Sequence, residues 1–344
     1  MKRTKNLFQK ISELDNLYLA FYKAKKGKSQ SSEMQDFQKN LEVNLQQMAS
    51  DIQNECFEIG NYKYFMIKDP KERKICAASF RERVLHHAIM NICHDSFENY
   101  QIFHSYATRP GKGTHAALQY AVACQQEHGW FIKLDVKKFF DTINHDQLKR
   151  FLENRFKEPK LLQLFFKIID SYNSSSNIGL PIGNLTSQYF ANFYMAQLDQ
   201  YAKEVLKIKK YVRYMDDIVF WSSSEERLMT NYGLMTNFLQ DNLKQIFKPI
   251  VVNRTNYGFS FLGYIVSQNG LMPNKQSKMR YIAKTKLIQH CSLCGTISEK
   301  VASQTFWALH TFFNFKINTH NQQKLQPCFA RRQLEQQRPE LPFG

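Results

Sequence analysis

Two adjacent acids, Asp216 and Asp217, interrupt a run of strand-forming residues in the stretch YVRYMDDIVF, residues 211–220. Carboxylates sit poorly inside a strand, whereas Asp adopts turn conformations readily and the flanking Tyr, Val, Ile and Phe favour strands. The pattern therefore predicts a tight hairpin over 211–221 with both acids in its turn. Taken alone, such a doublet is more often an ordinary solvated turn.

A third acid lies at the end of another predicted strand. Residues 130–135 read WFIKLD, so Asp135 follows bulky apolar residues, and Asn144 is placed to cap the next helix. If the two strands are neighbours in one sheet, three carboxylates meet at its edge, where their repulsion would favour protonation unless a cation intervened. Magnesium takes carboxylate and phosphate oxygens as ligands, and two ions about 3.5–4 Å apart can clamp an in-line phosphoryl displacement.

Charge and composition narrow the choice of partner. The 47 Lys and Arg against 30 Asp and Glu give a net charge of +17, which suits a polyanion, although a generally basic protein is the simpler alternative. No apolar run is long enough to span a membrane, and the amino terminus lacks a signal-peptide core, so we expect a cytoplasmic protein with no membrane partner. The 7 cysteines are expected to be reduced, and only Cys291 and Cys294 have a zinc-like spacing.

The remaining segments alternate between the helical and the strand period, with no internal repeat and no long linker. Strands are predicted at 62–67, 74–79, 130–135 and 259–267, and helices within 7–58 and at 79–100, 114–127, 144–170, 187–206, 225–246 and from 275 to about 320.

Several motifs together resemble the reverse transcriptase family, in its group II intron-like branch. YMDD between apolar strands is similar to the catalytic hairpin, FIKLDVKKFFDTI to the first acidic motif, and GLPIGNLTSQYFAN to the motif between them. KERKICAASFRERV and SYATRPGKGTHAAL resemble the fingers segments, and FSFLGYIV resembles the primer-grip hairpin. The motifs follow the family's order and cover about residues 60–270.

The resemblance implies an α+β right-hand polymerase fold, with fingers, a palm of antiparallel sheet backed by helices, and a helical thumb. It implies an RNA-directed DNA polymerase that copies a structured RNA template into cDNA from dNTP substrates with two Mg²⁺ ions. The expected divisions are a helical extension at 1–58, fingers at 59–129, a palm at 130–258 partly interleaved with a fingers segment, and primer grip, thumb and basic tail at 259–344.

The same resemblance assigns roles residue by residue. Asp135, Asp216 and Asp217 are the expected catalytic residues and metal ligands, and the Val136 carbonyl is expected to complete a metal shell. Phe140 matches the steric gate against a ribose 2′-hydroxyl, with a core aromatic as the alternative. The expected dNTP contacts are Lys71 (or Lys68), Arg73, Phe139, Phe140, Ile182 and Gln188, and the expected template or primer contacts are Arg81, Arg83, Arg109, Phe261, Leu262 and Gly263.

Ile182 opens the middle motif in an Ile-Gly-x-x-x-Ser-Gln form that is similar to reverse transcriptases of diversity-generating retroelements. This branch implies errors opposite template adenine and a small basic accessory protein. An antiphage-defence reverse transcriptase acting on a bound noncoding RNA is the main alternative, and a non-catalytic, maturase-like RNA-binding protein is a minor one. A dinucleotide-binding unit, with glycines at 111 and 113 and Asp135 as its acid, is a third possibility.

Overall fold

A computed structural model describes residues 6–28, 31–68, 72–127 and 129–313. The chain divides into two compact units, one formed by residues 1–117 and 128–254 and the other by residues 118–127 and 255–344. Among the described residues, none of the helices has the length and apolar content needed to cross a membrane.

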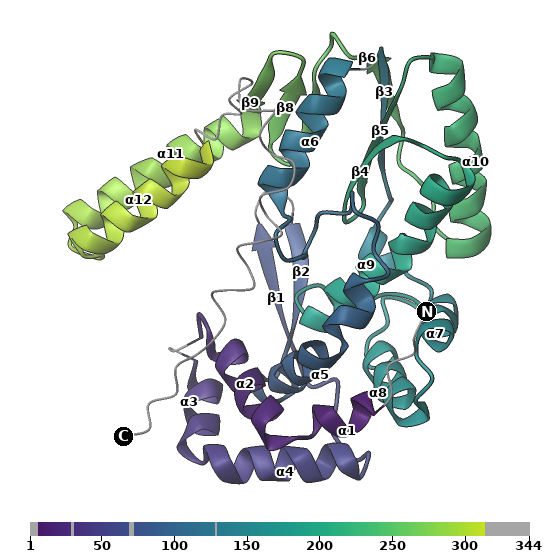
Figure 1. Cartoon of the computed structure of the whole chain (residues 1–344). Coiled ribbons are helices and arrows are strands. Elements are labelled where there is room, and N and C mark those ends of the chain that lie inside the picture. The colour runs from purple at the N-terminus through teal and green to yellow at the C-terminus, as the bar shows by residue number, and fades with distance from the viewer. Residues whose placement is uncertain (1–5, 29–30, 69–71, 128, 314–344) are drawn as a thin grey trace, which may run out of the picture. The chain divides into compact units, whose positions relative to one another are not determined.

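The first unit begins with four short helices, α1 (Leu7–Ile11), α2 (Leu14–Lys25), α3 (Ser32–Lys39) and α4 (Leu41–Gln53). Of these, α1, α2 and α3 pack on one long helix, α5 (Phe80–Glu98), and α4 packs on α2 and α3 (Figure 1). Ser79 caps α5, because its side-chain oxygen accepts a hydrogen bond from the Glu82 amide at 3.3 Å. The aromatic rings of Phe21 and Phe37 stack at 6.0 Å and help to close this bundle.

A two-stranded antiparallel ribbon leads into α5. It consists of β1 (Tyr62–Lys68) and β2 (Glu72–Ala78), and its register runs from Tyr62 opposite Ala78 to Lys68 opposite Glu72. Most side chains of β1 are exposed, and apolar ones are among them.

A four-stranded antiparallel sheet forms the centre of this unit, in the order β4-β5-β3-β6. The strand-forming residues of WFIKLD and YVRYMDDIVF predict three of these strands, but the short fourth, β6, was not predicted. The strands are β3 (Trp130–Asp135), β4 (Lys210–Tyr214), β5 (Asp217–Ser222) and β6 (Val251–Arg254).

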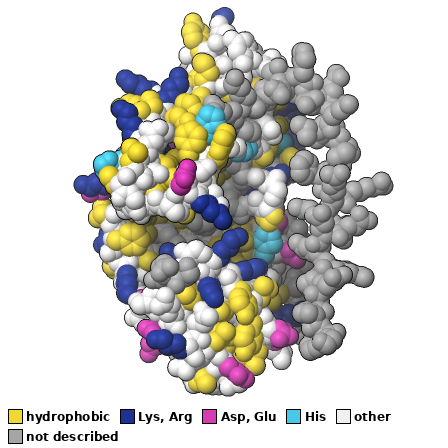
Figure 2. All heavy atoms as spheres, turned by 90° about the vertical axis from the view of Figure 1, so that its left-hand side faces the viewer, with side chains coloured by type: hydrophobic (Ala, Val, Ile, Leu, Met, Phe, Trp, Pro, Cys, Tyr) yellow, Lys and Arg dark blue, Asp and Glu magenta, His cyan; other side chains and the backbone are white. Residues whose placement is uncertain are grey.

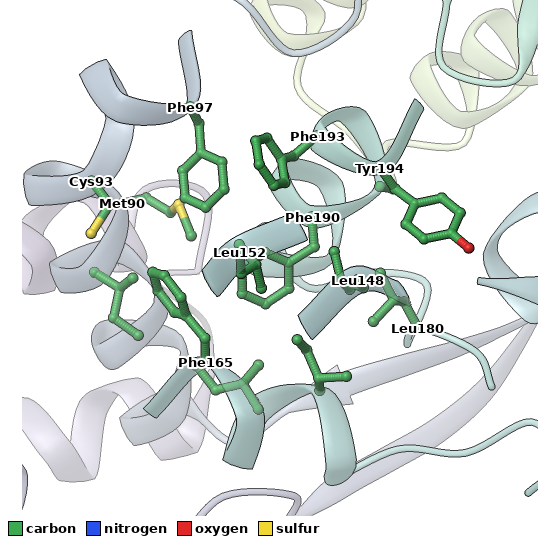
Figure 3. Packing of buried hydrophobic residues seen from close by; sticks show 14 of the residues in the cluster. Met90, Cys93, Phe97, Leu148, Leu152, Phe165, Leu180, Phe190, Phe193 and Tyr194 are labelled. Atoms are coloured by element: carbon green, nitrogen blue, oxygen red, sulfur yellow. The ribbon is translucent and has the colours of Figure 1, made fainter. Parts of the chain in front are cut away.

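Helices cover this sheet, and their aromatic side chains form the core shown in Figure 3. Phe97 lies at its centre, with the rings of Phe193 and Phe156 at 5.5 and 5.2 Å. The predicted cap of α7 is confirmed, since Asn144 accepts a hydrogen bond from the Gln147 amide at 3.0 Å. The elements are α7 (His145–Arg155), α8 (Pro159–Asp170), α9 (Leu185–Gln200), α10 (Glu225–Leu243), the 3₁₀ helix η1 (Phe139–Thr142) and the π-helix η2 (Tyr201–Val205).

The helix α6 (Thr114–Glu127) follows the two glycines of the possible dinucleotide-binding motif. The segment before it forms turns rather than a strand, and β3 pairs antiparallel with both of its neighbours. A dinucleotide-binding unit requires a parallel strand–helix–strand arrangement, so this alternative is excluded.

The second unit contains a three-stranded antiparallel sheet, in the order β7-β8-β9, and a pair of packed helices. Within this unit, the Gln125 side chain donates hydrogen bonds to the carbonyls of Thr255 and Tyr257 at 2.8 and 2.9 Å. The region predicted to be helical from 275 to about 320 forms two helices with a break at 294–298, and residues beyond 313 lie outside the described part. The elements are β7 (Phe259–Phe261), β8 (Tyr264–Ser267), β9 (Gly270–Pro273), α11 (Lys275–Leu293) and α12 (Glu299–Phe313).

Candidate functional site

The three acids that the sequence singles out lie together at one end of the four-stranded sheet. Asp135 ends β3 and pairs directly with Asp217, the first residue of β5, across the antiparallel ladder. Tyr214 also pairs with Asp217, so Asp216 lies in the two-residue turn between β4 and β5. The Val136 amide donates to the Asp216 carbonyl at 3.3 Å and ties this turn to β3. The expectation that the two strands are neighbours is therefore confirmed.

Burial and mutual repulsion perturb the carboxyl groups at this sheet end. Burial, followed by the nearby charges of Asp135 and Asp217, raises the pKa of Asp216 from its ordinary 3.8 to about 6. Burial also raises the pKa of Asp217, while the neighbouring Lys133 opposes this rise. Two adjacent, half-buried carboxyl groups with raised pKa values are the electrostatic state that a bound cation would relieve.

Two lysines supply positive charge to the acids. Lys133 Nζ lies 3.1 Å from Asp217 Oδ1, and Lys248 forms an ion pair with Asp135 Oδ1. The Lys248 amide also donates to the Asp135 carbonyl at 2.8 Å. Apart from these ammonium contacts, neither carboxylate oxygen has a hydrogen-bond partner within the described residues, although both atoms are buried. The lysines thus face oxygens that are otherwise unsatisfied.

These two lysines were not among the site residues predicted from the sequence. Lys133 precedes Asp135 by two residues, so strand alternation already places both side chains on one face, and this signal could have found it. Lys248 reaches Asp135 from the segment before β6, for which no local pattern gives a signal. As the side chains lie here, the described part of the chain contains no group of three or more His, Cys, Asp or Glu arranged to hold a metal ion.

The segment after Asp135 turns into η1. Val136 is fully buried. Phe139 is also buried, whereas Phe140 is half-buried, and their ring centroids lie 5.4 Å apart. The Phe140 carbonyl accepts a hydrogen bond from the Leu180 amide at 2.8 Å, which joins this segment to the start of the middle motif.

The middle motif lies against the ribbon strand β2. The Ile182 carbonyl accepts a hydrogen bond from the Cys76 amide at 2.9 Å. Gly183 has a φ of +123°, and a Cβ there would lie 3.0 Å from Ile75 and 3.1 Å from the Cys76 carbonyl oxygen, so only glycine fits. Gln188 lines a pocket of about 180 Å³ together with Arg83 of α5, so this pocket lies between the middle motif and the first turns of that helix.

Two cations, Lys71 and Arg73, are expected to grip a triphosphate. Lys71 lies outside the described residues. Arg73 lies on β2 opposite Ile67, and its side chain is exposed. The alternative Lys68 is also exposed and lies 3.7 Å from Glu72.

Two arginines expected to contact the template are engaged within the protein. Arg81 forms an ion pair with Asp51. Arg109 is held more tightly, because its Nε and Nη2 atoms donate to the Glu98 carboxylate at 2.7–3.0 Å. Its Nη1 atom also donates to two backbone carbonyls, at 2.6 and 2.7 Å.

The predicted primer-grip residues form the turn between β7 and β8, in the second unit. Phe261 is buried, whereas Leu262 and Gly263 both have positive φ, +49° and +90°. The Gly263 carbonyl accepts hydrogen bonds from the Asn274 amide at 3.0 Å and from the Ser277 hydroxyl at 2.8 Å. The turn is thereby fixed to the start of α11.

An antiparallel sheet, backed by helices, with carboxylates gathered at a strand end and an adjoining hairpin turn is consistent with the palm of a right-hand polymerase. The α+β fold class predicted from the sequence is confirmed. Residues 67–266, more than half of the chain, match the family described as reverse transcriptase (RNA-dependent DNA polymerase). The chain belongs to this family.

Individual relatives are distant. The putative COX1/OXI3 intron 2 protein of Saccharomyces cerevisiae is 22% identical and aligns with 74% of this chain and 38% of its own length. The group II intron-encoded protein LtrA of Lactococcus lactis subsp. cremoris is 27% identical, over 48% of this chain and 27% of its own length. The chain therefore spans less than half the length of these relatives. Two solved structures of telomerase from Candida tropicalis each give a TM-score of 0.48. The apo structure is 13% identical and covers 64% of this chain and 49% of its own, and the complex with a fragment of telomeric RNA is 12% identical and covers 74% and 53%.

Proposed function

We propose that this chain is an RNA-directed DNA polymerase that copies a structured RNA template into cDNA. The observation that carries the proposal is the ladder pair Asp135–Asp217 with Asp216 in the adjoining turn, in a chain of the reverse transcriptase family. Adjacent carboxylates at a strand end are suited to a reaction in which charge develops on phosphoryl oxygens. The chain's own residues would bind the template, primer and dNTP, align the reacting groups, and exclude nucleotides that carry a ribose instead of a deoxyribose.

The donor set fits two Mg²⁺ ions by its chemistry. Asp135, Asp216 and the Val136 carbonyl would hold them, with Asp217 assisting on the primer side. Hard carboxylate and carbonyl oxygens are the ligands that Mg²⁺ prefers, and two carboxylate oxygens here are buried with only lysine contacts. Bound at this position, the ions would activate the attacking oxygen and neutralise the leaving one.

A nucleic-acid template is supported by charge. The chain carries a net charge of +17. On the face drawn in Figure 2, Lys and Arg side chains are spread widely among hydrophobic ones, and acidic side chains are fewer. Such a surface attracts phosphates through counterion release, independently of sequence. Within this proposal, Arg73 and Lys71 bind the incoming dNTP, Phe140 excludes the ribose hydroxyl, and residues 59–129, 130–258 and 259–344 act as fingers, palm and primer grip with thumb.

Within this proposal, the chain acts as a reverse transcriptase of the diversity-generating retroelement type. Ile182 replaces a polar residue that would lie near the nascent base pair, so a hydrogen-bonding constraint is absent and errors opposite template adenine are expected. The template would be a structured RNA, and a small basic accessory protein would assist the reaction. Substituting Ile182→Gln tests the fidelity claim: the error rate opposite adenine should fall, and an unchanged error spectrum would contradict it.

The polymerase proposal is tested by dNTP incorporation on a primed RNA template with and without Mg²⁺. The double variant Asp216→Asn/Asp217→Asn should lose synthesis while retaining RNA binding, whereas Asp241→Asn, an exposed acid on α10, should behave as wild type. Equal activity in all three proteins would refute the assignment. Sequencing the co-purified nucleic acid separates the branches, since faithful or repetitive DNA from a noncoding RNA would favour the defence role.

A further inference from the structure

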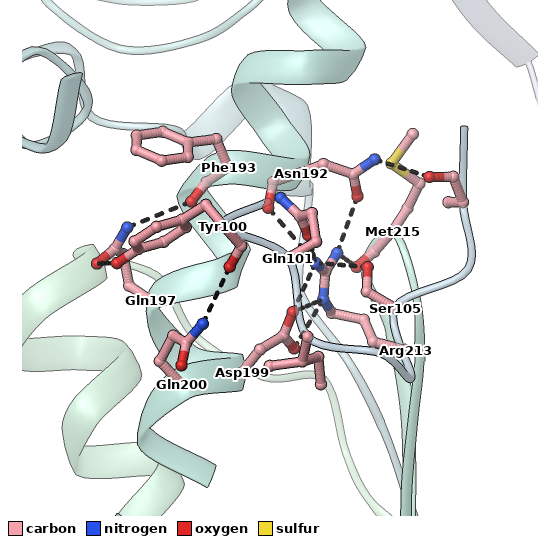
Figure 4. Close-up of polar contacts among 12 residues, drawn as sticks. Tyr100, Gln101, Ser105, Asn192, Phe193, Gln197, Asp199, Gln200, Arg213 and Met215 are labelled. Atoms are coloured by element: carbon pink, nitrogen blue, oxygen red, sulfur yellow. Dashed lines mark hydrogen bonds and ion pairs between the residues drawn. The ribbon is translucent and has the colours of Figure 1, made fainter. Parts of the chain in front are cut away.

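A charged network lies buried directly beneath the turn that contains Asp216 (Figure 4). Its centre is Arg213 on β4, whose side chain is completely buried. Asp199 on α9 is equally buried and pairs with it, accepting from Nε at 2.8 Å and from Nη2 at 2.7 Å. Tyr211 donates its hydroxyl to the same carboxylate at 2.7 Å. A buried Arg–Asp pair with this geometry holds both charges in one fixed arrangement.

The other donors of the guanidinium reach beyond Asp199. Nη1 donates to Asn192 Oδ1 and to the backbone carbonyl of Met215, each at 3.0 Å. Nη2 also donates to Ser105 Oγ at 3.0 Å and to Gln101 Oε1 at 3.1 Å. Arginine has five N–H donors in a rigid fork, and this site supplies acceptors for each of its three nitrogens. The Nη1 atom of Arg213 therefore donates to Met215, the residue immediately before Asp216.

Met215 needs this support because its backbone is strained. Its φ is +55°, in the left-handed region, which costs an L-residue other than glycine roughly 1–2 kcal/mol. In a two-residue hairpin, positive φ at the first turn position matches the twist of the strands and sets the direction of the next peptide. The hydrogen bond from Arg213 to the Met215 carbonyl fixes that peptide from inside, and the Val136 amide fixes the Asp216 carbonyl from β3.

The backbone of Arg213 is anchored as well as its side chain. Its amide donates to the His104 carbonyl at 3.0 Å, and its carbonyl accepts from the Tyr106 amide at 3.0 Å. Asn192 continues the network from α9, since its Nδ2 atom donates to the Ala107 carbonyl at 2.9 Å. The guanidinium is thus placed by α9, by the 101–107 loop and by β4 together, and it has little freedom to move away from Met215.

Stability alone is a weak reason for such a pair. Removing two charges from water costs about as much as their attraction returns, and hydrophobic replacements of buried pairs are often equally stable. A purely structural pair would also have no need to end on the Met215 carbonyl. We propose that Arg213 is a positioning residue for the polymerase reaction, which with Asp199 and Asn192 holds the Met215–Asp216 turn in the one conformation that places the Asp216 carboxylate beside Asp135. This inference rests on the proposed function for its catalytic consequence, but not for its structural content.

Arg213→Lys is the first test, because it keeps the buried positive charge but lacks the fork that joins Asp199 to the Met215 carbonyl. Arg155→Lys is the matched control: the Arg155 guanidinium donates to the Ser96 carbonyl at 2.7 and 2.9 Å, far along the chain from the turn. A double variant, Arg213→Met/Asp199→Asn, removes both charges and leaves an acceptor for Tyr211, so folding does not depend on an unpaired buried carboxylate.

Two measurements are made on all four proteins. Hydrogen exchange, read at Val136 and at residues 214–218, reports the turn directly and needs no enzymatic activity. Single-nucleotide incorporation gives kcat, the KM for dNTP and the Mg²⁺ concentration for half-activation. Arg213→Lys and the double variant should exchange the turn amides at least about tenfold faster, and kcat should fall about 10- to 100-fold with a higher Mg²⁺ requirement and a nearly constant KM. Arg155→Lys should match wild type in each respect.

The proposal is overturned if either folded Arg213 variant retains wild-type exchange at the turn or wild-type kcat and Mg²⁺ requirement. It is also overturned if Arg155→Lys shows the same changes, since these would then reflect general destabilisation. If wild-type protein incorporates no dNTP, the proposed function fails, and hydrogen exchange still decides whether Arg213 holds the turn.

Discussion

Asp216→Asn should make the protein more stable at neutral pH when no divalent cation is present. The folded state raises the pKa of Asp216 from 3.8 to about 6, so it binds the proton more tightly than the unfolded chain does. Below about pH 4 the group is protonated in both states and has no effect on stability. Between about pH 4 and 6 its ionisation increasingly opposes folding, and above pH 6 the cost is complete, at about 3 kcal/mol. Asn cannot ionise and avoids this cost.

The measurement is urea unfolding of wild type and variant from pH 4 to pH 8 in EDTA, analysed by linear extrapolation. The variant should gain up to about 3 kcal/mol over wild type at pH 7.5, and this difference should shrink toward zero near pH 4. Saturating Mg²⁺ should reduce the difference at pH 7.5 by stabilising wild type preferentially. Asp241→Asn, at an exposed position, serves as control. A difference that does not vary with pH would contradict the raised pKa of Asp216 and its two causes, burial and the neighbouring carboxylates.

Three further substitutions test other parts of the site. Phe140→Ala should admit ribonucleotides, measured as rNTP against dNTP incorporation; unchanged sugar discrimination would place the gate elsewhere. Lys248→Met removes a charge that lowers the pKa of Asp216, so the acid limb of the pH–rate profile should move to higher pH, and a shift to lower pH would contradict this electrostatic assignment. Gly183→Ala should destabilise the fold by about 1–3 kcal/mol, because the new Cβ meets the Cys76 carbonyl at a positive φ; a stability equal to wild type in urea would mean that the middle motif is not tied to β2 as described.

Local patterns were enough to predict the elements that present the acids. The strands that end at Asp135 and start at Asp217 consist of bulky, β-branched and aromatic residues next to an acid. Each of these patterns lies within about ten consecutive residues, so it can be recognised without the tertiary structure. The strand β6 was missed because it is four residues long and is stabilised by pairing with β3, about 120 residues earlier in the chain. Arg109 is predicted to contact the template, because the residues next to it in the sequence give no indication of its bidentate pairing with Glu98.

The charges around the acids were the hardest feature to predict, and the reason is physical. An arginine or lysine in a strand reads as solvent-exposed, because burying a cation without a partner is prohibitive, and the partner is named only by the tertiary structure. Arg213 is buried because Asp199 arrives from α9, and Lys248 faces Asp135 because the chain after α10 returns to β3. The Asp216–Asp217 doublet can be recognised in the sequence as a site of negative charge, whereas the cations that lie beside it can be identified only from the tertiary structure. Residues that position a turn are therefore to be sought among the buried ion pairs of the structure, and Arg213, paired with Asp199, donates a hydrogen bond to the turn itself at the Met215 carbonyl.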